Sequence, residues 1–173
     1  VRIGIGSDQR IGYSFIYPGL GYGGSCFPKD IKALTKIAKE NGYDAQLISA
    51  VEKVNEAQKL VIIQKIVNRF GKDLTGLSFG IWGLAFKPGT DDMREAPSIK
   101  IINELVRRGA HIKAYDPKAV DEAKNVFLKG LRNLTYVNSK YDALKNSNAL
   151  VLLTEWKEFR SPDFEKIKTQ LKT

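Results

Sequence analysis

Three consecutive stretches decide the fold: LSFGIW at residues 77–82, APSIKIINELVRR at 96–108 and HIKAY at 111–115. The first and third are short stretches rich in apolar residues, which is typical of strands. In the middle stretch apolar residues recur at intervals of three and four, the spacing of one helix face. The order strand, helix, strand predicts a β-α-β unit with parallel strands.

The same alternation continues to the end of the chain. Further strands are expected at 134–137 and 149–153, and further helices near 120–126, 141–145 and 162–171. A chain that alternates in this way forms a parallel sheet covered by helices on both faces. We therefore predict an α/β fold for the second half of the sequence.

The region upstream is predicted to be helical. Pro28 suits the first turn of a helix over 28–41, and Gly42 suits its end. A second helix is expected from Asp44 to Gly71, roughly 26 residues or ~39 Å long. Periodicity alone leaves open whether this long helix packs within the chain or forms a subunit interface or domain connection. The first 25 residues, rich in glycine, are expected to be irregular.

The composition is that of an ordinary globular protein. The chain has 173 residues, of which 43% are hydrophobic and 27% charged, and this excludes disordered, collagen-like and membrane-spanning classes. Its net charge of +9 is spread: residues 1–75 carry 11 basic and 7 acidic side chains, and residues 76–173 carry 17 and 12. Dispersed charge favours a small anionic ligand over nucleic acid, so neither nucleic acid nor membrane is an expected partner.

The cysteine content and the start of the chain bear on location. One cysteine, Cys26, cannot form an intramolecular disulfide, and no signal-peptide pattern is visible at the start. These features predict a cytoplasmic protein. Because the chain begins with Val1 rather than methionine, we expect it to be cut from something longer.

Cys26 is the candidate nucleophile. It lies at or just before the first turn of the helix over 28–41, where free N–H groups and nearby lysines stabilise a thiolate. Lys29 follows three residues later, and Asp30 at i+4 would share a helix face with the cysteine and assist a water or accept a proton. An inert buried cysteine is the alternative. No metal site is expected, because the chain has one Cys and one His, His111.

Residues 19–24, GLGYGG, match the dinucleotide-binding pattern G-x-G-x-x-G. The context argues against that function, because Pro18 precedes the glycines where a strand is required and two helices follow. A flexible surface loop is one alternative. We favour a loop whose glycines let the backbone approach a ligand closely, because it lies directly before Cys26.

A second set of candidate residues follows the first predicted strand, in the loop over residues 83–95. Ligands of open α/β sheets bind beyond the carboxyl ends of the strands, which places Lys87 and Arg94 where phosphates would lie. A solvated loop is the alternative. Asp116 ends the second strand and is similar to a ribose-binding acid, but it lies 33 residues after Gly83 rather than ~20. Its pattern equally fits a structural cap of the Asp-Pro turn.

Four motifs in a fixed order carry a family resemblance: DQRIG (8–12), GYGGSCFPKD (21–30), GLAFK (83–87) and DMRE (92–95). Across its whole length the chain resembles the UDP-glucose/GDP-mannose dehydrogenase family. The run around the cysteine is most similar to members that act on UDP-glucose, since members that act on GDP-mannose tend to carry Leu in place of Phe27. The resemblance implies a helical central and dimerisation segment over 1–75. It also implies a Rossmann-like UDP-sugar-binding domain over 76–173 that is incomplete at its C-terminal end.

The resemblance implies NAD-dependent oxidation of UDP-glucose to UDP-glucuronate, an activity that serves polysaccharide biosynthesis. Cys26 would form a thiohemiacetal and then a thioester, and Asp30 would assist hydrolysis. Lys29 and Arg94 would reach the NAD cofactor. The implied substrate-binding residues are Arg10, Phe15, Ile16, Tyr17, Pro18, Gly19, Tyr22, Gly23, Phe86 and Lys87. Arg10 would enter the site of a neighbouring subunit, which implies a homodimer or larger homo-oligomer with the long helix as a plausible dimer core.

The chain also departs from the family pattern. Family members begin with an NAD-binding domain and an upstream helix with a catalytic lysine and asparagine, and neither is present in these 173 residues. We therefore expect a fragment that binds UDP-sugar weakly and does not turn over alone. The alternatives are a dehydrogenase for GDP-mannose or another nucleotide sugar, and a non-catalytic nucleotide-binding and dimerisation module.

Overall fold

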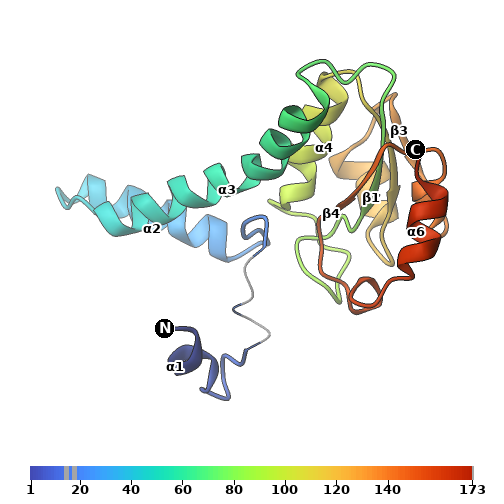
Figure 1. Cartoon of the computed structure of the whole chain (residues 1–173). Helices are drawn as coiled ribbons and strands as arrows, with labels where there is room; N and C mark the ends of the chain where they lie inside the picture. Colours follow the sequence, from blue (N-terminus) through green and yellow to red (C-terminus); the bar gives the residue numbers. More distant parts are fainter. Residues whose placement is uncertain (14–15, 17–18, 173) are drawn as a thin grey trace.

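The computed structural model describes residues 1–13, 16 and 19–172. A pair of helices, α2 (Phe27–Glu40) and α3 (Gln46–Phe70), projects from an α/β domain formed by the rest of the chain from β1 onward (Figure 1). A short helix, α1 (Arg2–Gly6), stands apart near the N-terminus. The expectation that the first 25 residues are irregular is thus wrong for this turn, which is closed by the N–H of Ile5 donating to the carbonyl of Val1.

The sheet has four parallel strands: β1 (Ser78–Trp82), β2 (His111–Tyr115), β3 (Leu134–Tyr136) and β4 (Ala149–Leu152). Their order is β3-β2-β1-β4, which confirms the predicted parallel sheet. The chain moves outward from β1 to β3 and then returns to the other side of β1. The topological switch point therefore lies between β1 and β4, where ligands of such sheets bind.

The remaining elements follow the expected alternation with shorter helices. They are α4 (Pro97–Arg107), α5 (Val120–Glu122), the π-helix η1 (Ala123–Phe127), the 3-10 turns η2 (Asp142–Leu144) and η3 (Lys157–Phe159), and α6 (Phe164–Gln170). The helices expected near 120–126 and 141–145 are therefore only partly α-helical. The last helix begins two residues later than expected.

Strand β1 is the centre of the core, and all five of its residues are buried. On one face Phe79 packs edge-on against Phe70 of α3, with ring centroids 5.4 Å apart. On the other face Trp82 packs against Tyr141 at 5.8 Å and Phe159 at 5.2 Å. Cover on both faces explains why β1 reads as a continuous apolar run instead of an alternating one.

The long helix α3 has two different halves. Its C-terminal half packs beside α4, where Ile63 and Ile66 are buried (Figure 1). In its N-terminal half Leu47 and Val54 are 78% and 68% exposed. This exposed apolar surface is the kind of surface that oligomers cover. A subunit interface along α3 stays a prediction.

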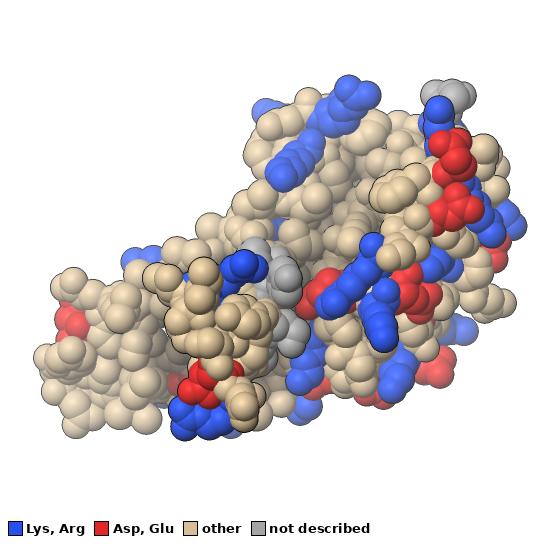
Figure 2. All heavy atoms as spheres, turned by 60° about the horizontal axis from the view of Figure 1, so that its bottom comes forward, with Lys and Arg blue, Asp and Glu red and all other residues tan. Residues whose placement is uncertain are grey.

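No helix in the described part of the chain is long and apolar enough to cross a membrane. On the face in Figure 2, Lys and Arg side chains are scattered among Asp and Glu rather than gathered in one stripe. This face thus matches the dispersed charge of the sequence.

Glu56 links the two helices α3 and α4 electrostatically. Its carboxylate accepts hydrogen bonds from Lys100 of α4 at 2.8 Å and from Lys59 of α3 at 2.7 Å. Hydrogen bonding to Lys100, followed by that to Lys59, lowers the pKa of Glu56 from 4.5 to about 2. The ammonium group of Lys59 is almost fully buried, so it depends on this partner.

We predict that Glu56→Gln lowers the free energy of unfolding by about 1 kcal/mol at pH 7, a value that allows for solvent screening of a half-exposed carboxylate. A lowered pKa in the folded state makes this contribution complete above about pH 4.5 and lost as the pH falls toward 2. Urea unfolding of both proteins from pH 7 to pH 2 measures it. The exposed Glu155, replaced by Gln, is the control. A difference between wild type and Glu56→Gln that stays constant over this range would contradict the assignment.

Candidate active site

Cys26 is the N-cap residue of α2, as the sequence predicts. Its side chain is exposed, so the alternative of a buried cysteine is wrong, while its reactivity stays a prediction. The backbone N–H of Asp30 donates to the carbonyl of Cys26 at 2.8 Å, and the sulfur lies 3.6 Å from Oγ of Ser25. The thiol thus sits at the positive end of a 14-residue helix.

The glycine loop, defined as residues 19–25, is attached to α3 by Asn55. The side-chain amide oxygen of Asn55 accepts from the N–H of Tyr22 at 2.7 Å, and its nitrogen donates to the carbonyl of Tyr22 at 3.2 Å. Gly21 has φ +108° and lies so close that a Cβ would fall 2.6 Å from that oxygen. In the structure, the absence of a side chain at Gly21 lets the loop pack closely against Asn55 of α3.

The same loop also packs against the 83–95 loop. The N–H of Gly24 donates to the carbonyl of Arg94 at 2.7 Å. A Cβ on Gly23 would lie 2.6 Å from the carbonyl oxygen of Glu95, and one on Gly24 would lie 2.9 Å from the ring of Phe86. Two motifs that are far apart in sequence therefore form one site, and glycines are required where they touch.

Cations gather beside the cysteine. A cavity of about 370 Å³ is lined by Gly24, Ser25, Lys29, Lys32, Arg94 and Glu95. The guanidinium of Arg94 donates to both carboxylate oxygens of Asp92, which raises the pKa of Arg94. The same hydrogen bonds lower the pKa of Asp92.

Of the other predicted site residues, Lys29 lines this cavity, while Tyr22, Asp30, Phe86 and Lys87 lie on the two packed loops or at the start of α2. Lys87 is exposed, with its ammonium 5.3 Å from the centroid of the Phe86 ring. Nζ of Lys29 lies 3.2 Å from the carboxylate of Asp30. The Tyr22 ring meets Phe27 edge-on at 4.6 Å. These residues form a rim around the glycine loop.

Among the described residues, Arg10 is not brought to the site. Arg10 pairs with Asp8 of its own segment at 2.6 Å, and that segment stands apart from α2 (Figure 1). Its expected role in a neighbouring subunit stays a prediction. Phe15, Tyr17 and Pro18 lie outside the described residues, and Ile16, which is described, is half-buried. Gly19 accepts a hydrogen bond from Gln58 through its carbonyl.

Asp116 serves as a structural cap. Its carboxylate is 4% exposed. One oxygen accepts from the N–H groups of Lys118 and Ala119 at 2.8 and 2.9 Å, which closes the Asp-Pro turn. The other accepts from the N–H groups of Leu84 and Ala85. A carboxylate satisfied in this way is not presented to a ribose.

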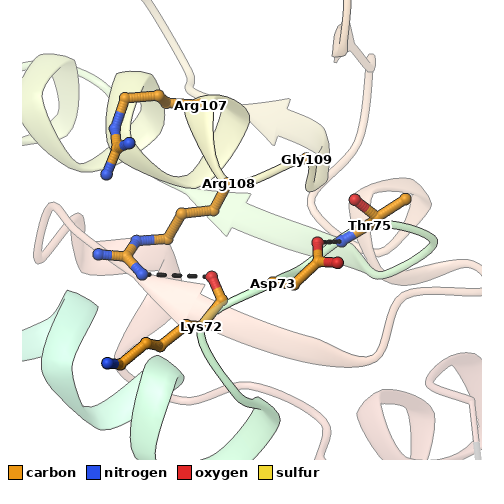
Figure 3. Close-up of a pocket in the computed structure, with 6 residues that line it drawn as sticks. All are labelled: Lys72, Asp73, Thr75, Arg107, Arg108 and Gly109. Atoms are coloured by element: carbon orange, nitrogen blue, oxygen red, sulfur yellow. Dashed lines mark hydrogen bonds between the residues drawn. The ribbon is translucent and has the colours of Figure 1, made fainter.

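A second hollow of about 440 Å³ is lined by Lys72, Asp73, Thr75, Arg107, Arg108 and Gly109 (Figure 3). It lies at the amino end of β1, opposite the end where ligands of parallel sheets bind. Arg107 and Arg108 are both paired with Glu104, whose pKa is lowered to about 2 mainly by Arg107. Two of its three cations are thus paired within the chain.

Sequence reasoning missed Asn55, the residue that fixes the glycine loop. On α3 the buried residues are Asn55, Lys59, Ile63 and Ile66, which form one stripe. The sequence feature that could have identified Asn55 is its spacing. Asn55 and Lys59 extend the buried stripe of Ile63 and Ile66 toward the N-terminus of α3 in steps of four residues, which is about one helical turn. The prediction of α3 used only the apolar members.

The fold and site together define a parallel α/β domain joined to a helical pair that begins at an exposed cysteine. The chain belongs to the UDP-glucose/GDP-mannose dehydrogenase family: the family's UDP binding domain matches residues 80–173 and its central domain matches residues 1–57. This confirms the resemblance carried by the motifs.

Individual relatives agree. The chain is 47% identical over 175 residues to UDP-glucose 6-dehydrogenase of Pseudomonas aeruginosa, covering 100% of this chain and 39% of that protein. It is 43% identical to UDP-glucose 6-dehydrogenase TuaD of Bacillus subtilis, covering 99% and 36%. The structure of a UDP-glucose dehydrogenase from Pyrobaculum islandicum matches with a TM-score of 0.82 at 35% identity, covering 94% and 37%. The chain therefore spans less than two fifths of these relatives.

We predict that Gly23→Ala destabilises the protein by about 1–3 kcal/mol, because its Cβ would overlap a backbone oxygen that cannot rotate away. Thermal unfolding measures the loss. Gly4→Ala is the matched control, since a Cβ there meets no atom within 4 Å. If Gly23→Ala is as stable as Gly4→Ala, the close approach of the two loops is not as described.

Proposed function

We propose that this chain provides the nucleophile and the UDP-sugar-binding part of an NAD-dependent UDP-glucose 6-dehydrogenase, which oxidises UDP-glucose to UDP-glucuronate. The observation that carries the proposal is the packing of the exposed-cysteine loop against the loop of Phe86, Lys87 and Arg94. Identity of 47% to a UDP-glucose 6-dehydrogenase supports the choice of substrate.

In the proposed reaction, Cys26 acts on carbon 6 of the sugar. The alcohol is first oxidised to an aldehyde, and the Cys26 thiolate adds to its carbonyl carbon to give a thiohemiacetal. Oxidation of that adduct gives a thioester. Water then attacks the thioester carbonyl, and the carbon–sulfur bond breaks to release the carboxylate and the thiolate. NAD, when bound, supplies the oxidising power by accepting a hydride in each oxidation.

The neighbouring residues have separate proposed roles. Asp30, one turn into α2 from the cysteine, holds the attacking water or takes its proton. Lys87 and the ring of Phe86 contact the nucleotide sugar, with the ammonium offsetting pyrophosphate charge. Lys29 and Arg94 line the cavity beside Cys26, where they meet the phosphates of NAD or substrate.

Among the described residues, only Lys29 and Arg94 are proposed to contact NAD. Gly21, Gly23 and Gly24 pack against protein atoms, and the carboxylate of Asp116 is fully hydrogen-bonded. Neither feature is available to hold a dinucleotide. We therefore propose that the rest of NAD is bound by a further domain, in keeping with the length of the relatives.

We predict that Cys26→Ser in the complete gene product lowers UDP-glucuronate formation by roughly 10³-fold or more, because a serine hydroxyl is not ionised at neutral pH. Production of NADH and of the acid, each followed with UDP-glucose and with GDP-mannose, measures activity and substrate choice. Binding of UDP-glucose by calorimetry is the control and should persist.

Three results would count against the proposal. Undiminished acid formation by Cys26→Ser would remove the cysteine from the mechanism. If the wild-type protein oxidised GDP-mannose faster than UDP-glucose, GDP-mannose would be the substrate instead. Binding of UDP-glucose with no oxidation by the complete gene product would support a non-catalytic nucleotide-binding module.

A further inference from the structure

The backbone between β1 and Phe86 is hydrogen-bonded on both sides by buried side chains. Oδ2 of Asp116 accepts from the N–H of Leu84 at 2.6 Å and from that of Ala85 at 3.2 Å. The hydroxyl of Ser98 donates to the carbonyl of Leu84, and Oγ1 of Thr154 donates to the carbonyl of Ala85 at 2.6 Å. Every peptide hydrogen-bonding group of this dipeptide therefore has a side-chain partner. We call Ser98, Asp116 and Thr154 the dipeptide clamp.

The dipeptide clamp joins distant parts of the domain. Ser98 lies in the first turn of α4, Asp116 follows β2, and Thr154 follows β4. All three are at most 4% exposed. Buried polar groups without partners cost about 1–3 kcal/mol each, so the arrangement resists any shift of the dipeptide. The backbone of Leu84 and Ala85 is thus held relative to three separate elements.

Its surroundings are closely packed. Gly83 has φ +94°, and a Cβ there would lie 2.5 Å from Cβ of Thr154. Nε1 of Trp156 donates to Oδ2 of Asp116 at 3.1 Å. The clamp therefore ties together the segments that follow β1, β2 and β4. These segments lie on both sides of the switch point, where the ligand of such a sheet binds.

The next residues along the chain are those of the candidate active site. Phe86, directly after the clamped dipeptide, donates its N–H to the carbonyl of Asp92 at 3.0 Å and packs its ring on Gly24. Lys87 follows. None of the three clamp residues lines the cavity beside Cys26. Their influence on a ligand would be exerted through the position of Phe86 and Lys87.

We propose that Ser98, Asp116 and Thr154 are positioning residues that set Phe86 and Lys87 for the UDP-sugar. The inference rests on the proposed function for the identity of the ligand. Asp116 follows β2, at the position where an acidic residue contacts a ribose in dinucleotide-binding domains. In this chain we assign Asp116 an internal positioning role instead.

Thr154 offers the sharpest test, because Asp116→Asn would place amide hydrogens against N–H donors and risk unfolding. Thr154→Val keeps the shape and removes the donor, which leaves the Ala85 carbonyl unpaired. In the complete gene product we expect the KM for UDP-glucose to rise about tenfold, with little change in the KM for NAD. Thr154→Ser, which restores a hydroxyl, should recover most of the loss.

Hydrogen exchange of the amides of residues 84–86, measured on the same proteins, reports the clamp independently of any ligand. Faster exchange in Thr154→Val than in Thr154→Ser is expected. An unchanged KM for UDP-glucose, or equal increases in KM for UDP-glucose and NAD, would overturn the positioning role, as would unchanged exchange. Failure of the wild-type protein to oxidise UDP-glucose would instead refute the proposed function, while the exchange rates would still decide whether the clamp holds the dipeptide.

Discussion

The structure depends on one backbone contact, the hydrogen bond from the N–H of Gly24 to the carbonyl of Arg94. It joins the loop that ends at Cys26 to the loop that leaves the sheet after β1. The distance of 2.7 Å is possible because Gly23 and Gly24 have no side chains to hold the chains apart. On either side of this bond, Asn55 fixes the glycine loop to α3 and the dipeptide clamp fixes the start of the 83–95 loop. The contacts of Asn55 and of the dipeptide clamp therefore fix the positions of the two loops that carry Cys26 and Lys87.

This arrangement explains the distribution of polar residues in the interior. Buried polar side chains are costly unless paired, and here they are used where one segment must be held against another. Asn55 holds a loop, buried Lys59 is paired with the half-exposed Glu56, and Asp116 satisfies five donors. The apolar core around β1 supplies the stability on which these contacts rest. The residues to which we assign catalysis and substrate binding, such as Cys26 and Lys87, are exposed.

Much of the fold and of the candidate site could be predicted from the sequence, and the features that could not be predicted have physical reasons. Strand β2 was predicted with its observed bounds because Gly109 and the Asp116-Pro117 pair, which favour turns, bound this short stretch, and Cys26 was placed at a helix start by Pro28. Helix α1 was missed because Gly4 and Gly6 argue against helix locally. The roles of Asn55 and Thr154 could not be predicted, since each acts on backbone groups more than 30 positions away. The sequence did not decide whether Asp116 binds a ribose or caps the Asp-Pro turn, because residue spacing does not show the direction of a carboxylate.

The central claim is that Cys26 and the 83–95 loop form one nucleotide-sugar site. Alkylation of Cys26 by iodoacetamide in the complete gene product can be followed by mass spectrometry on the peptide that contains this residue. Saturating UDP-glucose should slow the alkylation of Cys26 by about tenfold or more, since the sugar would cover the sulfur. An alkylation rate that is the same with and without UDP-glucose would contradict the account.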